Sequence, residues 1–244
     1  MIPRKVILLS LVTLVGLSCA TTNANLPRAS YTLVLNDVVV GVCSGVECKQ
    51  LELSSMGSGV IVASHKGSSW GITAGHVCKP KGSVLVSSKL TVVTYEGSVY
   101  AAELVGLMES SDICVIKLNG VSVPASRLAP AAPKIGDKVY SLASPLGIFD
   151  PKMVLQLDGY YCGKKRDTHT PSFDGMHKFP VLDSYSIPAT GGSSGGGIFN
   201  SKGELIGMTL LARGGFENFT LSIQYSTLAQ VVRAIREAAV EASK

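Results

Sequence analysis

The sequence has little charge and lacks any long hydrophobic run. Of its 244 residues, 16% are charged and 46% are hydrophobic, a balance that excludes an intrinsically disordered tail or a solvated helical repeat. No run reaches the roughly 18 apolar residues of a membrane-spanning helix, and no period of solenoid length recurs. A chain of this length can bury a core as one large β domain or as two small ones.

Metal-binding and nucleic-acid-binding patterns are also missing. The histidines do not combine with cysteine pairs in a zinc-site spacing; they are His65, His76, His169 and His177. We therefore predict no metal and no cofactor. The one compact basic cluster, residues 164–166, has no interleaved aromatic residues, so it is interpreted as a solvated loop and predicts no nucleic-acid partner.

The first 24 residues have the pattern of an export signal. Two basic residues at positions 4 and 5 precede twelve uncharged residues, Val6 to Leu17, and small residues follow. We expect cleavage after Ala20 or Ala24, which leaves a mature domain within residues 25–244 and lowers the formal net charge from +5 to +3. The predicted location is the periplasm or the extracellular space.

Cysteine use is compatible with an oxidising compartment, where disulfides form. Cys19 offers the alternative of a lipid anchor, although the residues before it fit a lipoprotein signal imperfectly. Five cysteines remain after cleavage, so at least one thiol is unpaired and the pairing stays open. Cys43 and Cys48 could close a tight hairpin, and Cys114 lies in an apolar run and is interpreted as a small buried hydrophobe. The other two are Cys78 and Cys162.

Short apolar runs separated by turn residues fill the chain from Tyr31 onward. Val, Ile, Thr and Tyr are frequent in them, and many recur every 8–12 residues or so, which indicates an all-β barrel or sandwich. The predicted strands are 31–42, 59–63, 83–86, 90–94, 101–106, 113–118, 138–142, 153–160, 197–199 and 204–211. The polar stretch Gly163–Pro180 is predicted to be the longest structureless loop of the mature chain.

One helix is predicted, at residues 227–242. Thr227 and Gln230 form a capping-box pair, and apolar residues from Leu228 to Ala239 recur at helical spacing. The charges on the opposite face are mixed in sign, so we expect the helix to cover a β domain and not to lie on a membrane surface.

Three short segments carry the residue types that acyl transfer needs. In Gly191–Gly197, glycines surround Ser194, so a nucleophilic hydroxyl and backbone N–H donors for an oxyanion can be exposed together. His76 follows small residues, and an imidazole can accept a serine proton at neutral pH. Asp112 opens an apolar run and could orient such a histidine. Each feature alone is also compatible with an ordinary structural role: a flexible loop, a core histidine and a solvated acid.

In the order His76, Asp112, Ser194, the segments resemble the trypsin-like serine proteases of the chymotrypsin fold, and among these the bacterial HtrA (Deg) type most closely. The matching motifs are Thr-Ala-Gly-His-Val, Ser-Asp-Ile-x-Val-Ile-Lys-Leu and Gly-x-Ser-Gly-Gly. The similarity extends from about Met56 to Ala239 and includes Gly-Ser-Gly-Val before the histidine segment. No later segment resembles the PDZ domain of that type.

The resemblance implies an all-β fold of two six-stranded antiparallel barrels followed by the C-terminal helix. The N-terminal barrel is expected at about residues 30–120 and the C-terminal barrel at about 133–226. The segment 120–132, with Val, Pro, Ala and Ser, is interpreted as the connector between them.

The resemblance also implies a role for each site residue. Ser194 would be the nucleophile, His76 the general base and then acid, and Asp112 the residue that orients His76. The N–H groups of Gly192 and Ser194, with Ser193 as a further candidate, would form the oxyanion hole. The implied function is an exported endopeptidase that cleaves polypeptides through an acyl-enzyme.

Individual residues at positions that set specificity and activation in this family predict how the protein differs from trypsin. Pro188, expected at the base of the substrate pocket, has no charge, so a pocket for Lys or Arg is not expected. Leu210 and Leu211 suggest an apolar or small P1 residue, whereas Arg213 keeps glutamyl specificity open. Ser193 replaces the residue that pairs with a new N-terminus in trypsin-type enzymes, so no zymogen cleavage of that kind is predicted.

Two other functions share these sequence features. A pseudoprotease could keep the fold as a binding module, and an ester hydrolase could use the same triad, because acyl transfer is common to both reactions. The α/β-hydrolases are excluded because their triad follows the order Ser, acid, His. The sequence does not predict the oligomeric state.

Overall fold

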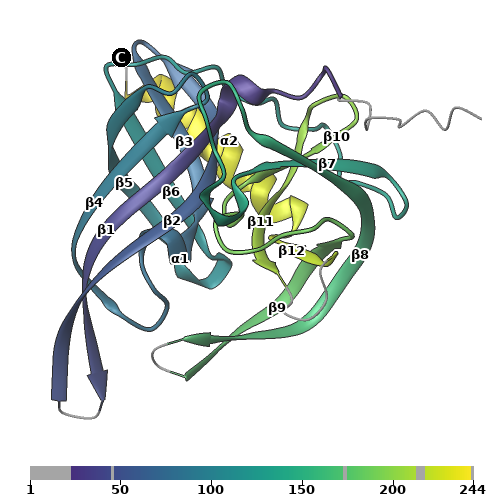
Figure 1. Ribbon diagram of the computed structural model, residues 1–244. Coiled ribbons are helices and arrows are strands. Elements are labelled where there is room, and N and C mark those ends of the chain that lie inside the picture. Colours follow the sequence, from purple (N-terminus) through teal and green to yellow (C-terminus); the bar gives the residue numbers. More distant parts are fainter. Residues whose placement is uncertain (1–22, 45–46, 173–174, 213–217, 243–244) are drawn as a thin grey trace, which may run out of the picture.

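The computed structural model describes residues 23–44, 47–172, 175–212 and 218–242. Its strands form two closed barrels, each with six strands paired antiparallel. The strand orders are β1-β2-β3-β6-β5-β4 and β10-β11-β12-β9-β8-β7. Figure 1 shows the barrels side by side, with helix α2 at the C-terminal end of the chain. The predicted chymotrypsin-like double barrel is confirmed.

The first barrel consists of β1 (Tyr31–Ser44), β2 (Glu47–His65), β3 (Ser68–Ala74), β4 (Val84–Thr94), β5 (Val99–Met108) and β6 (Ile113–Asn119). The second consists of β7 (Lys138–Ala143), β8 (Leu155–Ser172), β9 (Gly175–Tyr185), β10 (Gly197–Asn200), β11 (Leu205–Ala212) and β12 (Thr220–Ser222). The helices are α1 (Gly75–Cys78) and α2 (Tyr225–Glu241), and the single 3-10 turns are η1 (Arg28–Ser30), η2 (Glu109–Ser111) and η3 (Pro145–Gly147). Neither α-helix of the described chain has the length and apolarity to cross a membrane.

A continuous apolar core joins the two barrels to α2. Ile72 of β3, Met208 of β11 and Leu228 of α2 belong to one cluster of fully buried side chains. Removing this apolar surface from water is the main stabilising contribution to the fold. The shared core fixes one barrel against the other, so side chains from both can meet at a defined geometry.

The stretch Gly163–Pro180 is not a structureless loop, and that prediction is wrong. Its described residues lie in the β8–β9 hairpin, which pairs from Lys164↔Asp183 outward to Ser172↔Gly175. The basic cluster 164–166 therefore lies in a strand and not in a loop. The hairpin extends beyond the barrel (Figure 1), where exposed side chains such as Lys164, Arg166 and His169 alternate with half-buried ones, so its sequence shows no apolar alternation.

Helix α2 begins at Tyr225, two residues before the predicted start, so the capping box of Thr227 and Gln230 is wrong. The carboxylate of Asp183, on β9, accepts the Tyr225 N–H at 2.8 Å and so caps the helix from a distant strand. The predicted apolar stripe is confirmed, because Leu228, Val232, Ile235 and Ala239 are buried.

Two disulfides are present among the residues that the structure describes. Cys43 and Cys48 pair across the end of the β1–β2 hairpin, as the tight-hairpin hypothesis proposed. Cys78 pairs with Cys114, so Cys114 is buried as expected but also forms a disulfide that the sequence analysis did not assign. Both cysteines are fully buried, because this disulfide lies inside the first barrel. Cys162 is exposed and free.

Candidate active site

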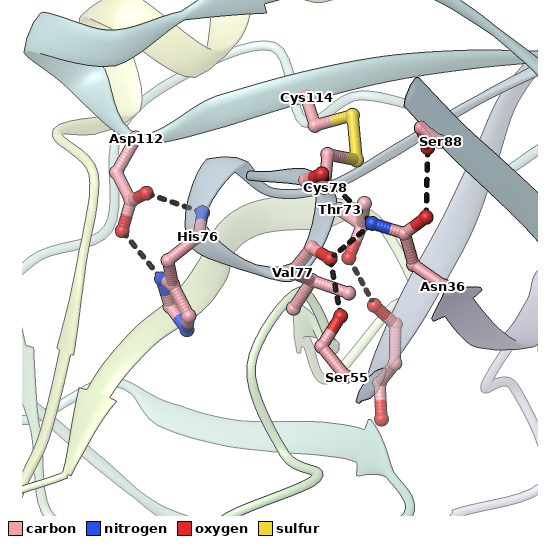
Figure 2. Close-up of a disulfide and its surroundings, with 10 residues drawn as sticks. Asn36, Ser55, Thr73, His76, Val77, Cys78, Ser88, Asp112 and Cys114 are labelled. Atoms are coloured by element: carbon pink, nitrogen blue, oxygen red, sulfur yellow. Dashed lines mark hydrogen bonds and ion pairs between the residues drawn. A yellow bond between two sulfur atoms is a disulfide. The ribbon is translucent and has the colours of Figure 1, made fainter. Parts of the chain in front are cut away.

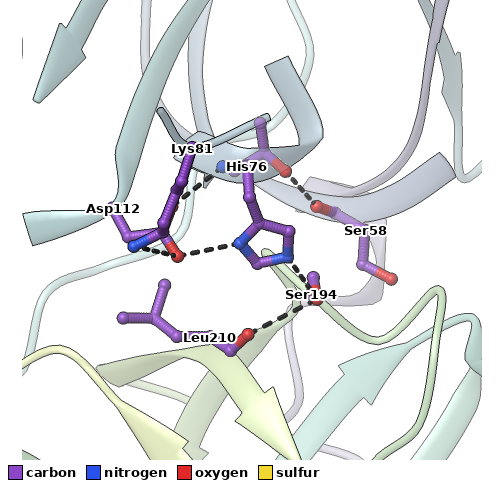
Figure 3. Close-up of polar contacts among 7 residues, drawn as sticks. Ser58, His76, Lys81, Asp112, Ser194 and Leu210 are labelled. Atoms are coloured by element: carbon purple, nitrogen blue, oxygen red, sulfur yellow. Dashed lines mark hydrogen bonds and ion pairs between the residues drawn. The ribbon is translucent and has the colours of Figure 1, made fainter. Parts of the chain in front are cut away.

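The three predicted site residues meet at the junction of the two barrels. His76 lies on α1, directly after β3, and Asp112 immediately precedes β6 of the same barrel, whereas Ser194 lies between β9 and β10 of the other barrel. His76 Nδ1 is 2.8 Å from Asp112 Oδ2, and His76 Nε2 is 2.9 Å from Ser194 Oγ (Figure 3). The geometry is a continuous hydrogen-bonded chain from a carboxylate through an imidazole to a hydroxyl.

Asp112 is held by the backbone that precedes and includes His76. The Gly75 N–H donates to the Asp112 carbonyl oxygen, and the His76 N–H donates to Asp112 Oδ1, both at 2.8 Å. A Cβ at Gly75 would lie 2.9 Å from Asp112 Oδ1, so only glycine allows this approach. This contact explains why a glycine precedes the histidine in Thr-Ala-Gly-His-Val.

The short helix α1 is anchored from three directions (Figure 2). The Asn36 amide, on β1, donates to the carbonyls of Val77 and Cys78 at 3.1 and 2.8 Å. The Ser55 hydroxyl, on β2, donates to the same Val77 carbonyl at 2.6 Å. The disulfide from Cys78 to Cys114 then joins α1 to β6. These contacts give the carbonyls at the end of the helix hydrogen-bond donors and fix the backbone that carries the His76 side chain.

The Ser194 loop is bound to the opposite barrel through Ser58. The Ser58 N–H donates to the Ser194 carbonyl at 2.7 Å, and its hydroxyl donates to the Gly192 carbonyl at 2.8 Å. The same hydroxyl accepts the Ser144 N–H at 2.9 Å. The sequence analysis noted Ser58 only as part of a motif; its role depends on contacts between residues more than 130 positions apart.

Two backbone donors beside Ser194 are available to an incoming oxygen. Within the described part of the chain, the N–H groups of Gly192 and Ser194 donate to no acceptor. The Ser193 N–H differs, because it donates to the Thr190 carbonyl at 3.0 Å. Gly192 has φ +89°, a conformation that favours glycine. Of the three predicted oxyanion donors, two are therefore free to act in this conformation.

The electrostatic setting of Asp112 depends on neighbouring cations. Burial acts to raise the pKa of Asp112, which is 1% exposed, but hydrogen bonds from His76 and the charges of His76 and Lys81 hold it below the ordinary value. Lys81 Nζ lies 3.5 Å from Asp112 Oδ2. Sequence reasoning missed Lys81, because a lysine in a polar turn carries no signal that it contacts a buried acid.

The predicted pocket residues have different surroundings. Leu210 is buried, and its carbonyl oxygen lies 3.5 Å from Ser194 Oγ (Figure 3). Leu211 and Pro188 are half-buried, and Arg213 lies outside the described residues. Among the residues that the structure describes, no three His, Cys, Asp or Glu side chains gather as a metal site.

A family model described as a trypsin-like peptidase domain matches residues 57–208, which is more than half of the chain. The matched segment contains His76, Asp112 and Ser194.

Curated proteins of similar sequence are serine proteases. The protein named "Probable periplasmic serine endoprotease DegP-like" from Ectopseudomonas mendocina (strain ymp) is 27% identical over 77% of this chain and 36% of its own length. "Serine protease Do-like HtrB" from Bacillus subtilis (strain 168) is 28% identical over 72% and 37%. "Serine endoprotease DegS" from Escherichia coli (strain K12) is 29% identical over 67% and 41%. The chain thus spans 36–41% of the length of these relatives.

Among solved structures, a variant of the HtrA-type protease AlgW with a decapeptide is similar in fold. Its TM-score is 0.65 at 17% sequence identity, and the match covers 85% of this chain and 64% of that one.

Proposed function

The chain belongs to the trypsin-like peptidase family, and on that premise we propose that it is a serine endopeptidase acting through Ser194, His76 and Asp112. The observation that carries the proposal is the hydrogen-bonded chain from Asp112 through His76 to Ser194, at 2.8 and 2.9 Å. Polypeptides are the proposed substrates, which agrees with the names of the relatives and with the decapeptide of the AlgW structure.

In the proposed mechanism, Ser194 Oγ attacks the carbonyl carbon of the scissile bond while His76 Nε2 accepts its proton. Asp112 keeps the imidazole oriented and stabilises its cation. The N–H groups of Gly192 and Ser194 donate to the oxyanion of the tetrahedral intermediate. His76 then donates the proton to the leaving amine. In the second half of the reaction, His76 accepts a proton from a water molecule that attacks the acyl-enzyme, and then donates it to Ser194 Oγ as the leaving group.

Labelling with a fluorophosphonate, read by intact mass and peptide mapping, tests this proposal. We expect one adduct, on Ser194, in the mature protein, and no adduct in the Ser194→Ala or His76→Ala variant. Ser201→Ala is the matched control, because Ser201 is an exposed serine in the turn after β10; its labelling should equal that of the parent. A folded protein that gives no adduct would instead support the pseudoprotease with a binding role.

Labelling does not separate a peptidase from an ester hydrolase, so turnover must be compared directly. We expect cleavage of a peptide library and of a casein substrate, both abolished in Ser194→Ala. Hydrolysis of activated esters without any cleavage of the peptides would favour the ester hydrolase. The library also tests the proposed apolar or small P1 residue, and a strong preference for Lys or Arg would contradict it.

We propose that residues 1–24 are a signal peptide and that the peptidase domain lies within residues 25–244. The periplasmic relative supports export, as do the two disulfides. N-terminal sequencing of the exported protein should give a start at residue 21 or 25. A lipid-modified Cys19, detected by mass and abolished by Cys19→Ala, would favour the anchored alternative.

We also propose that activity needs no new N-terminus. Ser193 is buried, and its hydroxyl accepts the Thr190 N–H at 3.3 Å, so local contacts hold this residue without a terminal ammonium. Protein with a chemically blocked N-terminus should label with the fluorophosphonate at the parent rate. Loss of labelling on blocking would contradict this proposal.

A further inference from the structure

Lys81 brings a second cation to the carboxylate of the proposed triad. Its ammonium lies 3.5 Å from Asp112 Oδ2, the oxygen that also accepts His76 Nδ1 at 2.8 Å. Figure 3 shows Lys81 and His76 reaching that oxygen from opposite sides. The Lys81 side chain is 12% exposed and that of Asp112 is 1% exposed, so solvent screens their interaction only weakly.

The ammonium of Lys81 is held in place by the second barrel. It lies 3.9 Å from the ring centroid of Phe179, a buried residue of β9, so a cation–π contact crosses between the barrels. Phe179 is in edge contact with His177 on the same strand. Lys81 is thus fixed by residues of both barrels.

Other charges surround this pair. The Glu109 carboxylate, on η2, accepts a hydrogen bond from the Lys79 ammonium at 2.5 Å, and its negative charge also attracts Lys81 at longer range. Burial lowers the pKa of Lys81, whereas the negative charges of Asp112 and Glu109 oppose that effect. The charged and titratable groups facing Asp112 are therefore His76 and Lys81, with Lys79, Glu109 and His177 farther out.

We infer that Lys81 is a positioning residue that shares the Asp112 carboxylate with His76 and so keeps His76 in its neutral, proton-accepting form at lower pH than Asp112 alone would allow. A carboxylate stabilises the protonated imidazole, and a cation on the same carboxylate offsets part of that stabilisation. The inference rests on the proposed function, because it assigns His76 the role of general base.

The first test is an NMR titration that does not depend on activity. The imidazole signals are followed from pH 4 to 9 in Ser194→Ala protein with and without Lys81→Met, and His76 is assigned with a His76→Gln variant. Removing the cation should raise the midpoint of the His76 titration by more than about 0.2 pH unit, because the Asp112 carboxylate is then no longer shared with a second cation. Lys81→Arg should keep the parent midpoint.

Lys117→Met is the matched control. Lys117 also lies over an aromatic ring, 5.5 Å from that of Trp70, but it belongs to β6 and has no contact with the Asp112 carboxylate. Its removal should leave the His76 midpoint unchanged. If Lys81→Met does not fold, Lys81→Gln replaces it, and the comparison with Lys81→Arg remains.

The second test is the pH dependence of kcat/KM on a fluorogenic peptide. The acid limb of the profile should move to higher pH in Lys81→Met by the same shift as the NMR midpoint, and Lys81→Arg should restore it. A purely structural role of Lys81 would lower the rate equally at all pH values and leave both midpoints in place.

The two hypotheses fail in different ways. A shift below about 0.2 pH unit in folded Lys81→Met overturns the inference about Lys81, whatever the activity. Absence of fluorophosphonate labelling in the parent protein overturns the proposed function, while the titration still decides whether Lys81 controls His76.

Discussion

The backbone N–H of Ser58 donates a 2.7 Å hydrogen bond to the carbonyl of Ser194, so a core strand of the first barrel fixes the loop that carries the proposed nucleophile of the second. The Ser58 hydroxyl extends this link to Gly192 and Ser144. The proposed oxyanion donors belong to the same short loop. Their position therefore depends on contacts between barrels and not on the glycine-rich loop alone.

Replacing Ser58 by alanine should lower kcat/KM about tenfold through kcat, with KM nearly unchanged. The variant loses a hydroxyl that holds the Gly192 carbonyl, and one such hydrogen bond contributes about 1–1.5 kcal/mol. Ser69→Ala is the matched control, because its buried hydroxyl also donates to a carbonyl and accepts an N–H, those of Val121 and Val123 in the segment after β6, away from the Ser194 loop.

Urea unfolding should show similar losses of stability for the two variants, about 1–3 kcal/mol each, because both leave a buried N–H and carbonyl without a partner. Peptide hydrolysis should separate them, since only Ser58 contacts the Ser194 loop. Equal effects of both variants on kcat would mean that Ser58 does not position the loop.

The two disulfides should contribute unequally to stability and activity. The Cys78–Cys114 bond spans a sequence separation of 36, and its cysteines lie two residues after His76 and two after Asp112. The chain-entropy model gives about 3–4 kcal/mol for this loop and about 2 kcal/mol for the separation of 5 between Cys43 and Cys48.

Replacing both Cys78 and Cys114 by alanine should therefore lower the unfolding free energy more than replacing both Cys43 and Cys48 by serine. The first double variant should also lose fluorophosphonate reactivity near its unfolding transition, whereas the second should keep it. Denaturant unfolding and labelling rates of the two proteins check this. A larger loss for the Cys43 and Cys48 variant would contradict the argument from loop length.

The contribution of Asp183 to the unfolding free energy should fall as the pH rises, whereas that of Asp112 should rise, because the pKa of Asp183 is raised and that of Asp112 is lowered. Burial raises the pKa of Asp183, and hydrogen bonds from the Tyr225 N–H and the Tyr161 hydroxyl oppose the shift only in part. The folded state therefore binds the Asp183 proton more tightly than the unfolded chain does. This contribution to stability is present at acid pH and declines as the pH rises through the folded-state pKa.

Unfolding free energies of the parent and of Asp183→Asn, measured by urea from pH 4 to 7, test the sign. The advantage of the parent over the variant should shrink as the pH rises from about 4. Asp137→Asn, at an exposed carboxylate of the same barrel, is the control. A parent-to-variant difference that grows with pH would show that Asp183 is stabilised in its charged form.

The sequence predicted the features that short motifs carry and missed those that depend on distant contacts. His76, Asp112 and Ser194 stood in recognisable segments, and the structure brings them together. The cap of α2 was missed because Asp183 lies 42 positions from Tyr225. Lys81 was missed for the same reason, since its partners are the Asp112 carboxylate, just before β6, and the Phe179 ring on β9.

The β8–β9 hairpin shows a second limit. Pattern reasoning detects strands by the apolar alternation that a buried face imposes. Residues such as Lys164 and His169 lie on a ribbon outside the barrel, where backbone hydrogen bonds form the ladder with exposed side chains. The same reasoning found β6, because that strand is buried along nearly its whole length.

Gly195, the residue after the proposed nucleophile, should tolerate no side chain. It has φ +88°, and a Cβ there would lie 2.0 Å from the Ser58 carbonyl oxygen and 2.3 Å from Thr73 Oγ1. Both atoms belong to core strands of the first barrel, so neither can move without breaking the contacts that hold the Ser194 loop. Gly195→Ala should lose at least about 2 kcal/mol of stability from overpacking and backbone strain.

Gly120→Ala separates strain from crowding. Gly120 has a similar φ of +74°, but a Cβ there would meet nothing within 4 Å. It should lose only the strain contribution, about 1 kcal/mol, and should label with the fluorophosphonate at the parent rate. Gly195→Ala should not label even at temperatures where circular dichroism shows that it is folded. If Gly195→Ala labels normally, the loop can move away from Ser58, and the contacts of the loop with the first barrel are not what fixes Ser194.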